Sequence, residues 1–137
     1  MAAMNLIEAS ENGTLAFGDY SLPQKTKLSD FEFEGDLYKV KTFREITRLE
    51  KNGLFVYESV PGTDVREFTQ NEDGISFIAA GGSDTMITVG LEGNTDYIVM
   101  INDMNAGRMT TGTSGKLSIS VDLSSGGECR VSVNRLG

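Results

Sequence analysis

The segment Lys116–Leu123, with the sequence Lys-Leu-Ser-Ile-Ser-Val-Asp-Leu, decides the fold class of this chain. Its odd-numbered positions are all aliphatic and its even-numbered positions are all polar. Since successive side chains of a β-strand point to opposite faces of the sheet, this alternation predicts a strand with one buried and one solvated face. Residues 129–133 alternate in the same way, so Cys129 is expected to point inward as a small buried hydrophobe, and the link Ser124–Gly127 is typical of a hairpin turn.

Turn signals divide the rest of the chain at short and nearly regular intervals. Glycine supplies the positive φ angle that tight turns need, and asparagine or aspartate tolerates it. Turns are expected at Asn12-Gly13, Gly35, Asn52-Gly53, Pro61-Gly62, Asp73-Gly74, Gly81-Gly82, Gly93-Asn94 and Ser114-Gly115. Runs of about five to eight β-forming residues between such turns are the signature of an all-β sandwich or barrel. We therefore predict an all-β fold, an immunoglobulin-like or jelly-roll-like sandwich of about eight or nine antiparallel strands.

The segment Thr42–Gly53 is the exception to this β character. Its apolar residues Phe43, Ile46 and Leu49 fall at helical spacing. Thr42 with Glu45 three residues later fits a capping box, and the Asn-Gly pair that ends the segment is a good helix stop. We expect one short helix near residues 42–51, with a continued strand as the alternative.

The length and the missing residue types limit what the chain can do. Its 137 residues suit one domain, and we expect a single sandwich over 1–137, with 1–63 as an N-terminal hairpin and helix layer and 64–137 as an immunoglobulin-like strand unit. The sequence holds no histidine and no tryptophan. Without histidine, Ser-His-Asp and Cys-His nucleophile pairs and imidazole metal sites are excluded. We expect no catalytic residue, no cofactor and no enzymatic activity.

The charge is acidic and unevenly spread. Asp and Glu number 20 against 12 Lys and Arg, for a formal net charge of −8. Seven basic residues fall between positions 25 and 51, but six carboxylates are interleaved with them, so no basic run predicts nucleic-acid binding. Residues 64–105 carry eight carboxylates and a single basic residue, Arg66. We interpret that stretch as a solvated acidic face, with a cation site or a basic partner as the alternatives.

Cysteine usage and the N-terminal residues bear on the compartment. A lone cysteine forms no intramolecular disulfide, which favours a reducing environment. Residues 1–10 have neither the basic region nor the apolar stretch of a signal peptide, and no apolar run is long enough to span a bilayer. We expect a cytoplasmic chain with no membrane partner, or an extracellular one if a leader is missing from this sequence.

Two expected strands, at 54–60 and 96–101, are apolar on both faces. Such strands are covered on both sides, either by another layer of the same chain or by a partner subunit. The N-terminal segment of the chain is one candidate cover, and a second copy of the chain is the other. In the second case, the interface residues are Leu54, Val56, Ile98 and Met100.

The run from Leu91 to Tyr97, Leu-Glu-Gly-Asn-Thr-Asp-Tyr, resembles the turn into the penultimate strand of fibronectin type III and related immunoglobulin-like modules. The family pattern is Leu-x-Pro-x-Thr-x-Tyr, and Gly93 stands here at the proline position. The resemblance implies a tyrosine corner, in which the Tyr97 hydroxyl bonds to the backbone a few residues upstream. The continuation to Ser118 also looks like the terminal sandwich modules of bacterial carbohydrate-active enzymes. The chain departs from a fibronectin module in carrying two further strands after this unit rather than one.

Such modules act as spacers, as protein-binding domains or as sugar-binding domains. Asp103 and Asn105, in the pattern Asp-x-Asn-x-Gly, match part of a calcium loop, although the same residues are ordinary in a hairpin turn. Sugar binding uses aromatic platforms, for which Tyr20, Tyr38 and Tyr57 are the candidates. We predict a non-catalytic protein-interaction or structural module that self-associates. The alternative is a carbohydrate-binding accessory module that uses these tyrosines with the help of calcium.

Overall fold

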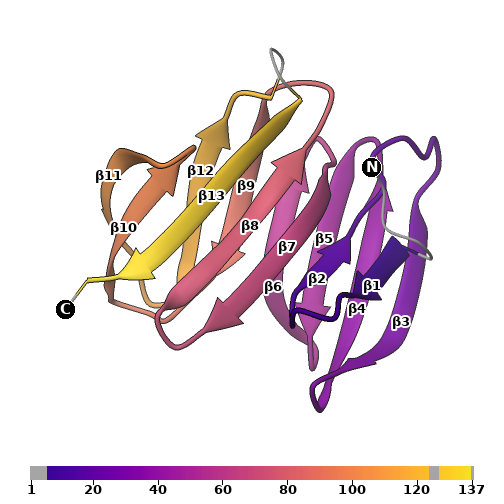
Figure 1. Ribbon diagram of the computed structural model, residues 1–137, viewed down its shortest axis with the longest axis horizontal. Helices are drawn as coiled ribbons and strands as arrows, with labels where there is room; N and C mark the ends of the chain where they lie inside the picture. The colour runs from indigo at the N-terminus through magenta and orange to yellow at the C-terminus, as the bar shows by residue number, and fades with distance from the viewer. Residues whose placement is uncertain (1–5, 124–126, 137) are drawn as a thin grey trace.

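A computed structural model describes residues 6–123 and 127–136. In this part of the chain, thirteen β-strands form two antiparallel sheets, so the prediction of an all-β sandwich is confirmed. Figure 1 shows the two sheets stacked face to face. We call the seven-stranded layer sheet A and the six-stranded layer sheet B.

Sheet A has the strand order β1-β2-β7-β8-β13-β10-β11, and sheet B the order β12-β9-β6-β5-β4-β3. Each sheet combines strands from the beginning and the end of the chain. The strands of sheet A are β1 (Ile7–Ala9), β2 (Leu15–Phe17), β7 (Asp64–Asn71), β8 (Gly74–Ala80), β10 (Asp96–Ile101), β11 (Met104–Thr110) and β13 (Glu128–Arg135). Those of sheet B are β3 (Thr26–Phe33), β4 (Asp36–Phe43), β5 (Ile46–Lys51), β6 (Leu54–Val60), β9 (Thr85–Gly90) and β12 (Lys116–Val121).

The short helix expected near residues 42–51 is wrong. β4 and β5 form a hairpin whose turn is Arg44-Glu45, and residues 46–51 of β5 pair with β4 on one side and β6 on the other. Strand pairing on both sides satisfies the backbone groups of β5, whereas a helix here would leave the edges of β4 and β6 unpaired. The Asn52-Gly53 pair forms the next hairpin turn, with φ angles of 52° and 80° that suit a type I′ turn.

The expected count of eight or nine strands is too low, since the described residues form thirteen. Three hairpin turns of the described residues contain no glycine or proline between their strands: Arg44-Glu45, Glu72-Asp73 and Asn102-Asp103. The asparagine and aspartate of the third turn adopt positive φ angles of 53° and 65°. The turn at Arg44-Glu45 carries no turn signal in the sequence, and β1 and β2 are only three residues each, so the strand count was underestimated.

The hairpin expected between the last two strands is also wrong. β12 lies in sheet B beside β9, while β13 lies in sheet A between β8 and β10, so the link crosses from one sheet to the other. Residues 124–126 of that link lie outside the described residues. β8 and β9 likewise lie in different sheets, and they pair with β13 and β12 respectively. The two crossings join the central strands β8 and β13 of sheet A to β9 and β12, which lie at one edge of sheet B.

The core between the sheets is continuous and contains an aromatic cluster. Phe17 packs edge to face on Tyr57 and on Phe68, at ring-centroid distances of 5.2 and 5.4 Å. Tyr57 in turn meets Phe77 edge to face at 5.3 Å. Such geometries add to the stability gained from burial of the rings. Cys129 is buried in the same core, as expected, and burial raises the pKa of its thiol.

Candidate functional site

Tyr97 forms the corner that the family resemblance implies. Its hydroxyl accepts a hydrogen bond from the backbone N–H of Glu92, five residues upstream, at 3.1 Å. Tyr97 is buried at the start of β10, and Thr111 closes the same corner by donating its hydroxyl to the Glu92 carbonyl at 2.6 Å. This geometry fixes the path of the chain from sheet B into sheet A. The corner thus has a structural role.

The three candidate tyrosines for sugar stacking lie apart from one another, and two of them are core residues. Tyr57 is fully buried, its hydroxyl is hydrogen-bonded to Thr63 at 2.8 Å, and burial raises its pKa above its usual value. Tyr38 is also buried and faces inward from β4. The prediction that these two tyrosines form a platform for a sugar is therefore wrong, because both rings are buried in the core. Tyr20 is half-buried in the loop before β3.

Asp103 and Asn105 lie in and just after the turn between β10 and β11. Asp103 is the second turn residue, and the Asn105 carboxamide oxygen accepts the N–H of Gly107 at 2.8 Å. No group of three or more acidic or cysteine side chains that could hold a metal ion occurs among the described residues. The Asn105 side chain thus supports the bulge of β11, and a calcium role for this turn stays a prediction.

The four residues predicted for an interface do not form one surface. Leu54 is 72% exposed at the start of β6, but Val56, two residues later, is buried in the core at a strand irregularity. Ile98 and Met100 are half-buried on the outer face of sheet A, in a different layer. Val56 is therefore covered by the chain itself and is not available to a partner.

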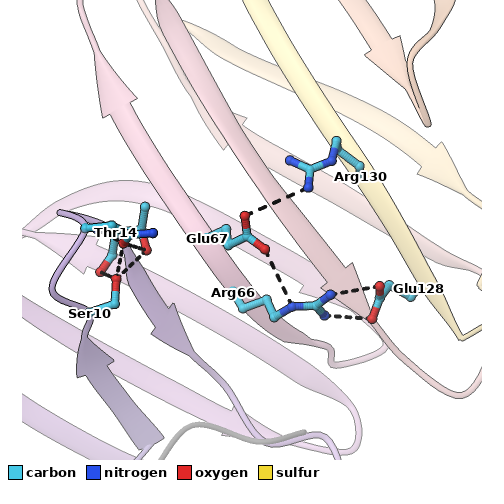
Figure 2. A network of polar contacts seen from close by, with 7 residues as sticks. Ser10, Thr14, Arg66, Glu67, Glu128 and Arg130 are labelled. Atoms are coloured by element: carbon cyan, nitrogen blue, oxygen red, sulfur yellow. Dashed lines mark hydrogen bonds and ion pairs between the residues drawn. The ribbon is translucent and has the colours of Figure 1, made fainter.

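A network of charged side chains covers part of the outer face of sheet A. Figure 2 shows its members, which are Arg66, Glu67, Glu128 and Arg130. The Arg66 guanidinium donates two hydrogen bonds, of 2.6 and 2.8 Å, to the Glu128 carboxylate. This contact lowers the pKa of Glu128. Glu67 lies 3.9 Å from both Arg66 and Arg130. The two arginines flank Ile78 in the strand register, and Ile78 is only 5% exposed although it points away from the core. The arginine stems therefore cover this apolar residue.

The outer face of sheet B has the opposite character, because it exposes an uncovered apolar row. The row consists of four residues from four neighbouring strands, Phe43, Ile46, Val60 and Met86. Val60 and Met86 are register partners, and they are 52% and 46% exposed. Phe43 and Ile46 are register partners as well, and they are half-buried. The sequence pattern assigns Phe43 and Ile46 to a helix, whereas the hairpin turn between them places both on the same face as register partners.

A cluster of basic side chains lies beside the apolar row on the same face. Lys27, Lys41 and Arg48 stand directly opposite one another on β3, β4 and β5, and Lys39 lines the same shallow hollow of about 240 Å³. Desolvation and the positive charges of Lys25, Arg48 and Lys27 lower the pKa of Lys41. Like charges placed opposite one another on a sheet are destabilising. Glu50 and Glu58 offset part of this repulsion, because they form ion pairs with Arg48 at 3.2 and 3.4 Å.

A cleft of about 710 Å³ opens at one end of the sandwich, between strand ends of the two sheets. Its wall combines apolar side chains with amides and charges, among them Leu54, Leu91, Gln70, Glu72 and Arg135. A volume of this order is typical of small-ligand sites. The cleft lies beside the tyrosine corner, since Tyr97 also lines it.

Comparisons with protein-family models, with curated proteins and with solved structures found no match for this chain. The assignment of a function therefore rests on the geometry of the sheets themselves. In the described ranges, no helix has the length and apolar character that would allow it to span a bilayer.

Proposed function

We propose that this chain is a non-catalytic protein-interaction module that self-associates through the outer face of sheet B. The observation that supports the proposal is the apolar row, which is left open to solvent at Val60 and Met86. On sheet A, the comparable residue Ile78 is covered by arginine stems. Exposed apolar rows bordered by polar residues mark interaction surfaces in folded proteins.

The charge pattern supports a second copy of the chain as the partner. The basic cluster lies on a protein whose formal net charge is −8, and residues 64–105 carry eight carboxylates with Arg66 as their only basic residue. The outer face of sheet B also carries Glu50 and Glu58 beside the basic cluster, so charges of both signs on this face can meet opposite charges of a second copy. Such a contact weakens as the salt concentration rises, because exposed charges are screened.

The family resemblance supports an interaction role as well. The hydrogen bond from the Glu92 N–H to the Tyr97 hydroxyl is the one that a tyrosine corner makes in immunoglobulin-like sandwiches. We assign the chain to that general class of module, in which a rigid double sheet presents its faces and loops to partners. The assignment is an analogy of architecture and does not by itself select a ligand.

The test is a sedimentation-velocity series of the full chain over a range of concentrations. Val60→Lys places a charge in the apolar row at an exposed position, so we expect it to lower the average mass relative to the wild type. Glu58→Gln is the matched control, because it changes the net charge by the same amount on the same face of β6 and leaves the row intact. Equal masses for wild type and Val60→Lys would contradict association through this face.

The cleft favours a second candidate function, which is carbohydrate binding. Amide and charged side chains beside an apolar wall suit a sugar. The aromatic residues that line the cleft are Phe55 and Tyr97, in place of the three tyrosines expected from the sequence. A glycan array probed with and without calcium tests this candidate. Leu54→Ala, inside the cleft, should reduce binding, while Leu37→Ala, an exposed leucine outside it, should not. An array without signal in both conditions excludes the candidate.

A further inference from the structure

Three of the four sheet edges carry features that discourage pairing with another chain. β1 is only three residues long, and the pairings of β3 and β11 both contain a register shift. Short strands and bulges are common ways in which proteins protect their sheet edges. β12 is the exception, because its six residues pair one for one with β9 without a shift and contain no proline. Its inward side chains are all apolar, and they complete the core at the end of sheet B.

The free edge of β12 has a defined set of backbone groups. The Leu91 N–H donates to the Gly115 carbonyl at 2.9 Å, which makes this pair a hydrogen-bonded one. Hydrogen-bonded and non-hydrogen-bonded pairs alternate along antiparallel strands, so the odd-numbered residues of β12 bond to β9. The N–H and C=O groups of Lys116, Ser118 and Ser120 therefore point away from β9. No strand in the described part of the chain pairs with them.

We propose that β12 pairs with β12 of a second copy, antiparallel, about a two-fold axis at Ile119. In this register, Ser118 of one copy stands opposite Ser120 of the other. The outward-pointing backbone N–H and C=O groups of the two serines then hydrogen-bond to each other. The two copies of sheet B, with six strands each, then form one twelve-stranded sheet. A two-fold contact of this kind is closed, so it yields a dimer and not a fibre.

The charges at the ends of β12 select this register. With Ile119 on the axis, Lys116 of each copy faces Asp122 of the other, whereas a shift of one pair along the strand places Lys116 opposite Ser120. Asp122 is hydrogen-bonded to the Asp84 carboxyl, and this contact raises the pKa of Asp84. In the dimer, Lys116 of the second copy therefore compensates the negative charge of Asp84 and Asp122 at this end of β12. The arrangement occurs twice in the dimer because of its symmetry.

The edge contact goes beyond the proposed function, because it names a second surface that is separate from the apolar row. Val60 lies on β6, with β9 between it and β12. The Val60→Lys variant removes the face contact and leaves the β12 edge unchanged. All edge variants are therefore made in this background, where only the edge contact remains to hold two copies together.

The experiment uses two charge reversals, Lys116→Glu and Asp122→Lys, measured by sedimentation velocity. We expect the Val60→Lys parent to be a dimer, and each reversal to weaken the dimer about tenfold or more, because like charges then face each other twice. An equal mixture of the two reversed chains restores both opposite-charge pairs, so it should form a heterodimer. This recovery also shows that both chains are folded. Lys25→Glu, the same reversal at an exposed position before β3 and away from the edge, should leave the dimer intact.

The outcomes separate the two proposals. A monomeric Val60→Lys parent, reversed chains that dimerise as well as their parent, or a mixture that gains no dimer would each overturn the edge contact. If the wild type and Val60→Lys are dimers of equal mass and the mixture behaves as expected, the edge contact stands and the face contact fails.

Discussion

Thr63→Val is expected to destabilise the fold, because it removes a buried hydroxyl group that is hydrogen-bonded to two other side chains. Thr63 is fully buried in the segment between β6 and β7, where the chain passes from sheet B to sheet A. Its hydroxyl is hydrogen-bonded to the Tyr57 hydroxyl and to the Ser59 hydroxyl, both at 2.8 Å. Valine has almost the same shape as threonine, so the substitution removes two hydrogen bonds and leaves little cavity.

The expected cost follows from the two partners left behind. A buried hydroxyl that loses its hydrogen bond costs about 1–3 kcal/mol, so we expect the free energy of unfolding to fall by about 2–4 kcal/mol. For a domain of this size, this corresponds to a drop in Tm of roughly 10 °C. Urea denaturation measures the change, and the m-value should stay constant because the surface exposed on unfolding is the same.

Two further variants make the test specific. Thr88→Val makes the same chemical change on the exposed face of β9 and should shift stability by less than about 0.5 kcal/mol. Tyr57→Phe combined with Thr63→Val removes one stranded hydroxyl, so the double variant should lose less than the sum of the single losses. A Thr63→Val protein as stable as the wild type, or strict additivity in the double variant, would refute the reasoning.

Three other predictions follow from single contacts. Tyr97→Phe removes the hydrogen bond from the Glu92 N–H and should cost about 1 kcal/mol in urea denaturation, while a silent change would show that the corner is held by packing alone. Gly74→Ala should cost more than about 2 kcal/mol, because the residue has a φ of 150° and a Cβ there would lie 1.8 Å from a backbone oxygen of β13; a Tm equal to that of the wild type would contradict this. Asp84→Asn should raise Tm at neutral pH and lose this effect in acid. The contact with Asp122 raises the pKa of Asp84, so the folded wild type loses stability as pH rises above the usual range of an aspartate, and a pH-independent difference would argue against it.

Local patterns in the sequence predicted the features that depend on a few consecutive residues. The alternation in Lys116–Leu123 predicted β12, with inward residues that the structure buries. The Leu91–Tyr97 run implied a hydrogen bond that the structure contains. Both depend on steric rules that act over a few residues, such as the period of two in a strand.

The prediction failed where long-range pairing outweighed a local signal. Residues 42–51 have helical spacing of their apolar side chains, yet β5 lies between β4 and β6 and satisfies the backbone of both. The link after β12 has the composition of a hairpin turn, yet β13 joins the other sheet, where β8 and β10 provide two partners instead of one. In both cases, backbone hydrogen bonds to distant strands decided the outcome.

The candidate surfaces depended on tertiary structure almost entirely. By itself, the sequence determined an acidic, all-β chain without histidine, because composition and period-two alternation are local properties. Only the pairing of β3, β4 and β5 placed Lys27, Lys41 and Arg48 opposite one another, although carboxylates separate them along the chain. Only the order of strands in sheet B left β12 at an edge. Register and strand order bring distant residues together, and for that reason the surfaces available to a partner are set by the folded chain.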